Sequence, residues 1–273
     1  MIRRVKVHHL NCATLHPFGS RGDRLLPSRL VAHCLLVERP EGLLLVDTGF
    51  GTGDIADPGR LGRPFRTFVG PVLDPSETAL AQLTALGFSA ADLSDIVVTH
   101  LDLDHAGGLG DFPDARVHVF ADELDAALAP TLREKARYIG AQWAHGPRWQ
   151  QHRVAGEEWL GFESVTVLGD DVLLVPLRGH TRGHCGVAVR TEGGADGDRW
   201  LLHAGDSYFN IGEKQTPPTC PSGLRMFQSL MQVDGKARHH NQERLRSLNA
   251  DHGTTVTMFS AHDAAEFDAL AGS

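Results

Sequence analysis

Runs of apolar residues divide this chain into many short strands and a few helices. Nine stretches either alternate between apolar and polar residues or are continuously apolar, as expected of strands buried on one or both faces. They are residues 3–9, 30–38, 42–47, 96–99, 115–120, 164–168, 172–177, 200–203 and 254–259. Apolar residues at helical spacing predict helices over 76–86, 122–128, 132–139, 222–232 and 237–249, with a short helix at the end of the chain. Between them, 21–27 and 51–71 are rich in Gly, Pro and Arg and are expected to be loops.

The strand at 96–99 leads directly into four residues with metal-binding side chains. Four of the six positions from 100 to 105 are occupied by such residues, namely His100, Asp102, Asp104 and His105. Two glycines then turn the chain. Imidazole nitrogens and carboxylate oxygens both suit a divalent transition ion, and alternate positions in a short loop can converge from one side. The alternative is a polar loop that merely contains histidines. The spacing favours a metal site at the end of a strand.

Four other predicted strands deliver similar residues at or near their ends, namely Asp47, His184, Asp206 and His262. A carboxylate at the end of a buried strand needs a partner, because an unpaired buried charge is costly. Asp47 could hydrogen-bond to the turn that follows it, or it could orient a metal-binding histidine, and the sequence leaves both interpretations open. Five strand ends with this chemistry are difficult to obtain by chance.

Two segments allow more than one interpretation. Residues 121–162 contain Trp143, Trp149 and Trp159, which either pack in the core or form a lid or insert over an apolar substrate. The predicted helix at 237–249 carries several arginines, and the default expectation for such charges is a solvated face. These arginines are Arg238, Arg244 and Arg246.

Composition restricts the classes of function. The chain has 273 residues, of which 41% are hydrophobic and 22% charged, with no linker or low-complexity segment, so we expect one globular domain over 1–273. A net charge of -8 argues against general binding to nucleic acid or anionic membranes. There is no signal-peptide pattern at the start and no apolar run long enough to span a bilayer, so a cytoplasmic location is expected. The oligomeric state stays open, with a homodimer among the alternatives.

The four cysteines are expected to be free, buried thiols, because they lie far apart in the sequence and form no CxxC pair. They are Cys12, Cys34, Cys185 and Cys220. No Gly-x-Ser-x-Gly elbow is present, and Cys185 has no evident base beside it. The sequence therefore gives no indication of a Ser or Cys nucleophile.

Taken together, these motifs resemble the metallo-β-lactamase superfamily. The resemblance runs from the Asp-Thr-Gly at 47–49 to the final His-Asp pair, and so covers nearly the whole chain. It implies an α/β fold, a four-layer αββα sandwich of two mixed sheets flanked by helices. Within the superfamily the chain looks most like the N-acyl homoserine lactonases, through Gly-His-Thr-x-Gly-His at 179–184 and Asp-Ser-Tyr at 206–208.

The resemblance also implies a set of ligands for two divalent metal ions, most simply zinc. One ion would be held by His100, Asp102 and His184, the other by Asp104, His105 and His262, and both by Asp206. Tyr208 falls close to where the lactonases place a tyrosine beside the metals, although it is one residue nearer the bridging aspartate. Asp47 and His180 are expected to support the ligands from outside.

Asp102 departs from the family pattern HxHxDH, which has histidine at this position. Two divalent ions with three aspartates and one hydroxide would have a total charge of zero. The usual ligand set has histidine in place of Asp102 and leaves one positive charge on the cluster. The extra oxygen ligand favours iron or manganese, and replacing it in Asp102→His is expected to restore the charge and favour zinc. A carboxylate here also resembles the flavodiiron branch, although this chain lacks the flavodoxin-like domain of that branch.

The expected function is hydrolysis of a lactone or related ester, a small-molecule substrate. A metal-bridging hydroxide would attack the carbonyl, Tyr208 would stabilise the oxyanion, and Asp104 would pass a proton to the leaving alkoxide. The alternatives are a thioester or other acyl hydrolase with the same metals, a non-haem di-iron redox protein, and a metal-binding regulatory protein without turnover.

Overall fold

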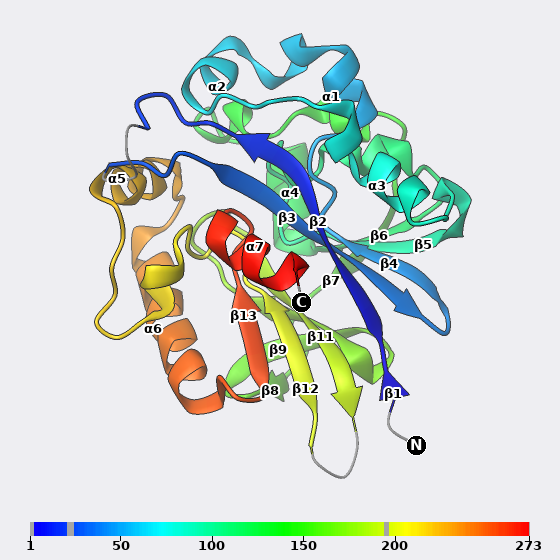
Figure 1. Ribbon diagram of the computed structural model, residues 1–273, viewed down its shortest axis with the longest axis vertical. Coiled ribbons are helices and arrows are strands. Elements are labelled where there is room, and N and C mark those ends of the chain that lie inside the picture. The colour runs from blue at the N-terminus through cyan, green and yellow to red at the C-terminus, as the bar shows by residue number, and fades with distance from the viewer. Residues whose placement is uncertain (1–2, 21–24, 194–196, 273) are drawn as a thin grey trace.

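Two β-sheets lie face to face, with helices on their outer sides (Figure 1). The computed structural model describes residues 3–20, 25–193 and 197–272. The first sheet has six strands in the order β2 (Lys6–Leu15), β3 (Leu30–Arg39), β4 (Gly42–Val46), β5 (Leu93–Val97), β6 (Arg116–Phe120) and β7 (Arg148–His152). The second has β13 (Val256–Phe259), β12 (Arg199–His203), β11 (Cys185–Gly193), β10 (Val172–Pro176), β9 (Phe162–Leu168) and β8 (Glu157–Trp159), with β1 (Arg3–Arg4) paired to β11.

The helices connect and cover these strands. They are α1 (Thr52–Ala56), α2 (Arg63–Phe68), α3 (Ala79–Ala85), α4 (Ala121–Leu128), α5 (Ser222–Met231), α6 (Gly235–His252) and α7 (Ala264–Ala271). Short 3-10 turns lie at Pro58–Leu61, Pro75–Glu77, Ala90–Asp92, Gly107–Asp111, Glu134–Ala136, Gly140–Trp143, Gly169–Asp171 and Ile211–Lys214. None of the helices in the described ranges is both long and apolar enough to cross a membrane.

Strand alternation explains the layers. In β3, Leu35 and Val37 face the second sheet and pack with apolar side chains of β10 and β11, whereas Leu36 faces outward into the cluster that includes Leu83 of α3. On the far side of the second sheet, apolar side chains pack against Leu245 of α6. The order of layers is therefore helix, sheet, sheet, helix, and the four-layer αββα prediction is confirmed.

Two parallel strand pairs bring the chemistry to one edge of the molecule. β4 pairs in parallel with β5 in the first sheet, and β12 pairs in parallel with β13 in the second. Parallel neighbours end on the same side, so the residues that follow these four strands meet there. Backbone hydrogen bonds join the sheets at this edge, from Cys185 N to Thr99 O at 3.0 Å and from His33 N to Ala261 O at 2.9 Å.

Some predicted elements were wrong. The helix predicted at 132–139 is a single 3-10 turn at Glu134–Ala136, because Arg137 and Tyr138 are both drawn into the interior and so short a helix has little stability of its own. The predicted loop at 51–71 contains α1 and α2. Strand β7 was missed because it is a largely exposed edge strand without an apolar alternation.

Residues 121–162 contribute to both sheets. β7 is the edge strand of the first sheet and β8 that of the second, so much of this segment is built into the sandwich. Trp159 is buried and makes an edge contact with Trp200, with ring centroids 5.5 Å apart, and Trp149 packs against the first sheet's core. These contacts favour packing for the tryptophans, while a lid role for the segment stays a prediction.

One charge expectation was wrong, and the expectation of free, buried thiols holds for three of the four cysteines. Arg238 is only 3% exposed, and its guanidinium donates to the side-chain oxygens of Gln228 and Gln232, so this part of α6 is not a solvated face. The amide oxygens supply the hydrogen bonds that burial would otherwise remove. All four cysteines are free; Cys220 is half-buried and the other three are buried.

Candidate metal centre

The loop after β5 is fixed by the end of β4. Asp47, which has a positive φ of 54°, accepts hydrogen bonds from the backbone N and the hydroxyl of Thr99, both at 2.7 Å. Its Oδ2 also lies 2.8 Å from Nδ1 of His105. Burial alone would raise the pKa of Asp47, but His105 lowers it to about 2. The carboxylate is therefore charged and orients a histidine, which is the second of the two roles left open by the sequence.

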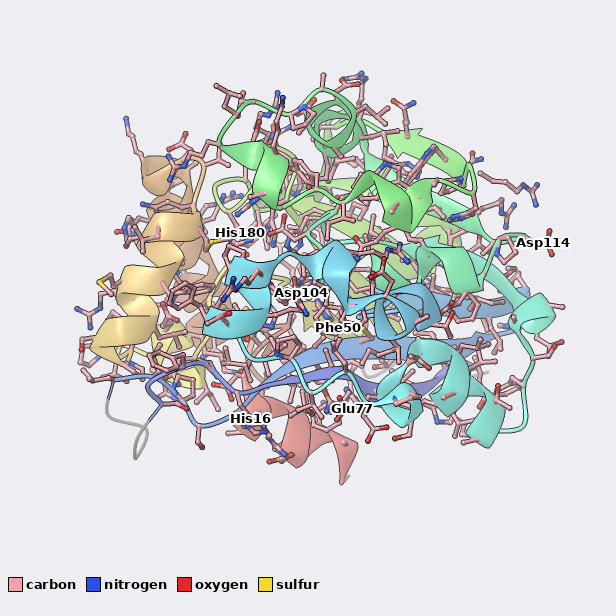
Figure 2. The ribbon with its side chains drawn as sticks, turned by 90° about the horizontal axis from the view of Figure 1, so that it is seen from above. His16, Phe50, Glu77, Asp104, Asp114 and His180 are labelled. Carbon is pink, nitrogen blue, oxygen red and sulfur yellow. The ribbon has the colours of Figure 1, made fainter. Side chains whose placement is uncertain are left out.

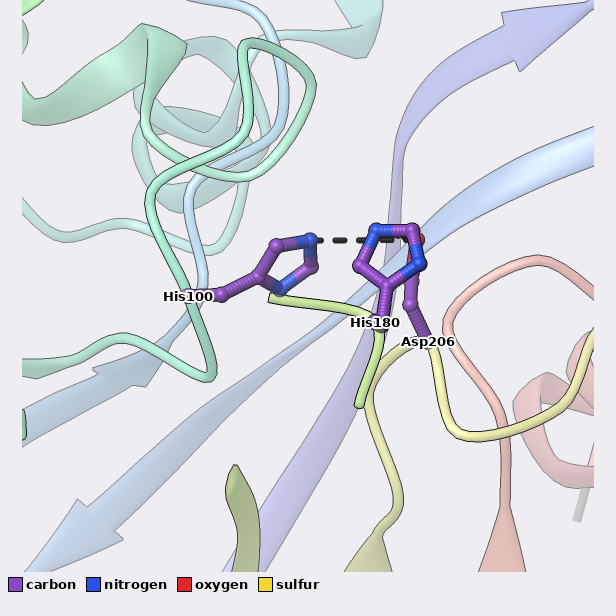
Figure 3. Close-up of side chains that lie close together, drawn as sticks. All are labelled: His100, His180 and Asp206. Carbon is purple, nitrogen blue, oxygen red and sulfur yellow. Dashed lines mark ion pairs between the residues drawn. The ribbon is translucent and has the colours of Figure 1, made fainter. Parts of the chain in front are cut away.

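A first group of atoms that could bind a metal ion comes from three loops that follow β5, β10 and β12. His100, His180 and Asp206 each place one such atom within 4.8 Å of the others (Figure 3). Nε2 of His180 lies 3.3 Å from Oδ2 of Asp206, and Nε2 of His100 lies 3.8 Å from the same oxygen. These separations leave room for an ion between the atoms, since each would then bind it at about 2 Å.

A second group lies beside the first and consists of Asp104, His105 and His262. The Nε2 atoms of the two histidines are 3.4 Å apart, and Nε2 of His262 is 3.8 Å from Oδ2 of Asp104. In the view from above, Asp104 of this group and His180 of the first are both labelled near the middle of the molecule (Figure 2). Asp104 is the most accessible of these ligands, with 13% of its side chain exposed.

Asp206 lies between the two groups. Its Oδ1 is 3.2 Å from Nε2 of His105 and 3.1 Å from Nε2 of His262, while its Oδ2 faces the first group. One carboxylate can therefore reach both sets of imidazoles. This is the arrangement that a bridging ligand requires.

Hydrogen bonds to the opposite ring nitrogen aim the histidines inward. Nδ1 of His262 lies 2.7 Å from the carbonyl of Val31, and Nδ1 of His100 lies 3.0 Å from the Thr99 hydroxyl. As in His105, Nε2 is left to face the site. Partners of this kind fix both the ring orientation and the tautomer of a ligand histidine.

The geometry assigns the two histidines of the 179–184 element differently from the prediction. Nδ1 of His184 lies 2.9 Å from the carbonyl of Leu177, and its Nε2 accepts a hydrogen bond from the backbone N of Asp206 at 2.8 Å. Both ring nitrogens of His184 are thus used by the backbone, whereas His180, expected only to support the ligands, joins the first group. His184 instead binds the backbone of Asp206, the residue whose carboxylate lies between the two groups.

Asp102 lies at the side of the first group. Its Oδ2 is 3.0 Å from Nε2 of His180 and 3.5 Å from Nε2 of His100, but it is not among the three most tightly grouped residues. Its Oδ1 is 3.4 Å from Nε of Arg137. Asp102 therefore faces the site with one oxygen and a buried arginine with the other.

Tyr208 does not lie as expected. Its hydroxyl donates to the carboxylate of Glu266, at 3.1 and 3.2 Å, and its ring belongs to the apolar cluster between the second sheet and α6. Burial and the neighbouring Glu266 raise the pKa of Tyr208 well above its ordinary value. The ring and the hydroxyl of Tyr208 are therefore held in the core, and this geometry gives no support to the expected role in stabilising an oxyanion.

Glu123 was missed by the sequence analysis and links the two ligand loops. Its Oε1 accepts from the backbone N of Leu101 and the hydroxyl of Tyr138, and its Oε2 from the hydroxyl of Thr181 and the backbone N of Gly183. The residue is fully buried in α4. In the sequence Glu123 is an ordinary charged residue of the predicted helix at 122–128, and its four partners lie 15 to 60 residues away.

The residues fit divalent metal ions. Nε2 of His100 is buried and has no hydrogen-bond partner among the described residues, which is costly unless something else binds it. Burial lowers the pKa of His180 to about 4, so its imidazole is neutral and can bind a cation. Burial opposes a charge on His105, but Asp206 and Asp47 raise its pKa well above 6.5, so a metal ion would displace a proton there.

Comparison with known proteins identifies the family. The sequence model of the metallo-beta-lactamase superfamily matches residues 28–232. The chain belongs to this superfamily. A probable metallo-hydrolase of Mycobacterium tuberculosis is 43% identical over 263 residues, covering 95% of this chain and 80% of that protein. The N-acyl homoserine lactonase AttM of Agrobacterium fabrum is 31% identical over 211 residues, covering 76% and 77%.

Solved structures agree on the fold of this superfamily member. An N-acyl homoserine lactone hydrolase with N-hexanoyl-L-homoserine bound at its catalytic metal centre superimposes with a TM-score of 0.72, covering 98% of this chain and 96% of that one. The two sequences are 20% identical, so the likeness concerns the fold alone. The prediction of the superfamily and of lactonases among its relatives is confirmed.

Proposed function

We propose that this member of the metallo-beta-lactamase superfamily opens lactones or closely related esters with the help of two divalent metal ions. The observation that carries the proposal is the position of Asp206 between two groups of ligand atoms. Ions bound there would polarise a carbonyl and lower the pKa of water, which is the chemistry of ester hydrolysis. The lactonase relatives support a lactone as the substrate class.

The chain's own residues supply the rest of the mechanism. The proposed ligands of one ion are His100, His180 and Asp206. Those of the other ion are Asp104, His105 and His262. Asp104, the most accessible of them, is placed to carry a proton between the site and the leaving alkoxide. Zinc is the simplest expectation for a histidine-rich site, and the carboxylates also admit iron or manganese.

Metal analysis and a substrate panel test this proposal. Protein purified without chelator should contain close to two ions per chain and should hydrolyse N-acyl homoserine lactones. Asp206→Ala should lose most of the metal and the turnover, whereas Asp251→Ala, an exposed aspartate of α6, should keep both. Wild-type protein without metal, or Asp206→Ala with full metal and turnover, would contradict the site assignment.

The substrate panel and the metal analysis, together with a measurement of oxygen consumption, separate this function from its alternatives. Faster turnover of acyl thioesters than of lactones would identify a thioester hydrolase with the same metals. A di-iron redox protein is the second candidate, and the observation that favours it is the Asp102 carboxylate 3.5 Å from His100. Iron at full occupancy together with oxygen consumption would select it over the hydrolase.

A further inference from the structure

Arg137 is a buried arginine beside the first ligand group. Only 6% of the residue is exposed, although it belongs to no long helix or strand. Its Nη1 donates to the carbonyl of His180 at 3.0 Å and its Nη2 to the carbonyl of Met231 at 2.7 Å. Because a guanidinium keeps its proton in proteins, a permanent positive charge sits against the loop that carries His180.

The remaining edge of this guanidinium faces Asp102. Nε of Arg137 is 3.4 Å from Oδ1 of Asp102, an oxygen that is buried and has no hydrogen-bond partner among the described residues. The other oxygen of Asp102 points to the imidazoles of His100 and His180. The aspartate is therefore shared between the arginine and the ligand group.

Charge explains why these two residues belong together. In the family pattern HxHxDH the position of Asp102 holds a neutral imidazole. An aspartate alone would add one negative charge to the site, and an arginine alone would add one positive charge close to bound cations. Side by side, the two residues add no net charge to the site, and in this they match a neutral histidine.

We propose that Asp102 and Arg137 act as a single net-neutral unit in place of the second histidine of the motif, and that Arg137 sets the metal affinity of the first group through this charge. The inference rests on the proposed metal-binding function and goes beyond it, because it assigns a role to a residue outside the ligand set. Arg137 is a positioning residue, since it acts on the metal through Asp102 and His180.

Pairing with Arg137 reverses the expected effect on zinc affinity of a single substitution at position 102. If Asp102 is made neutral while Arg137 stays, an uncompensated positive charge remains beside the metal. Zinc affinity should then fall by about 10- to 100-fold, the usual effect of changing an outer partner of a metal ligand. Removing the arginine as well should recover at least about tenfold of that loss, because the charge is balanced again.

The experiment is a cycle of variants read by zinc affinity, measured on apo protein by competition with a chromogenic chelator. Asp102→Asn changes the charge and almost no volume, and Asp102→His repeats the test with the family residue. Each is combined with Arg137→Gln, which removes the charge, and with Arg137→Lys, which keeps a charge but not the paired hydrogen bonds to two carbonyls. Arg182→Gln is the matched control, since Arg182 lies in the same loop as His180 but pairs with Glu134 at 2.9 Å.

The expected result is recovery of zinc affinity on adding Arg137→Gln, and none on adding Arg137→Lys or Arg182→Gln. Equal recovery with Lys, or further loss with Gln in both backgrounds, would overturn the proposal and leave Arg137 as a clamp on two carbonyls. Thermal unfolding of each apo variant identifies any that fail to fold. Wild-type protein that binds neither zinc nor iron nor manganese would overturn the proposed function as well, whereas normal wild-type binding without coupling between positions 102 and 137 would overturn only the pair.

Discussion

Replacing Glu123 by Gln should loosen the metal centre without touching a ligand. The carboxylate of Glu123 accepts four hydrogen bonds, two on each oxygen, from the loop that follows β5, the 179–184 element and Tyr138. An amide of the same shape accepts on one oxygen only. Whichever way it turns, its NH₂ group faces a backbone N–H, either that of Leu101 or that of Gly183.

The loss of stability follows from the number of hydrogen bonds that the amide cannot accept. One buried N–H loses its acceptor, and a hydrogen bond to a charged group contributes about 1.5–3 kcal/mol. The one hydroxyl that then faces the NH₂ group can rotate and accept from it, so that bond loses less. In total we expect Glu123→Gln to lower the free energy of unfolding by about 2–4 kcal/mol, which corresponds to a fall in Tm of roughly 5–15 °C for a chain of this size.

Calorimetry of the metal-free protein measures this effect, and chelator competition measures its consequence for the site. Zinc affinity should fall by about 10- to 100-fold, because one of the hydrogen bonds that tie the loops carrying His100 and His180 together is lost. Glu243→Gln, on the exposed face of α6, is the control and should change neither quantity. A Tm and a zinc affinity within error of wild type would refute the role given to Glu123.

Three further outcomes are expected. Tyr208→Phe should cost about 1 kcal/mol of stability through its lost bond to Glu266 and leave kcat unchanged; a large fall in kcat would return the tyrosine to the active site. His180→Ala should lose zinc from the first group, whereas His184→Gln should retain more of it, and the reverse order in metal analysis would restore the family assignment. Burial lowers the pKa of His9 to about 4, so the unfolded chain binds more protons between pH 6.5 and 4 and wild-type stability should fall there as the pH falls. His9→Gln should show a smaller fall in urea unfolding over that range, and an equal fall would contradict the argument.

The sequence by itself determined several strands and the residues at their ends, and its resemblance to the superfamily implied the sandwich. The apolar runs that precede Asp47 and His100 favour buried strands, and each leads to a polar residue whose hydrogen bonds must be satisfied where the strand ends. Asp47 and the loop from His100 to His105 are therefore local consequences of the chain, and the structure places them where the pattern indicates.

Only the tertiary structure decided which of these side chains meet. His180 and His184 are equally good ligands by composition, and the choice between them depends on hydrogen bonds to Leu177 and to the backbone of Asp206, which comes from a different strand end. A spacing pattern carries no information on which ring nitrogen is already used.

The same limit explains Glu123 and Arg137, which look like ordinary surface residues in a weak helical pattern. Their charges are tolerated in the interior because groups far away in the sequence complete their hydrogen bonds and balance their charge. Local pattern specifies where a strand ends, but the free energy of a buried charge depends on neighbours brought together only by folding.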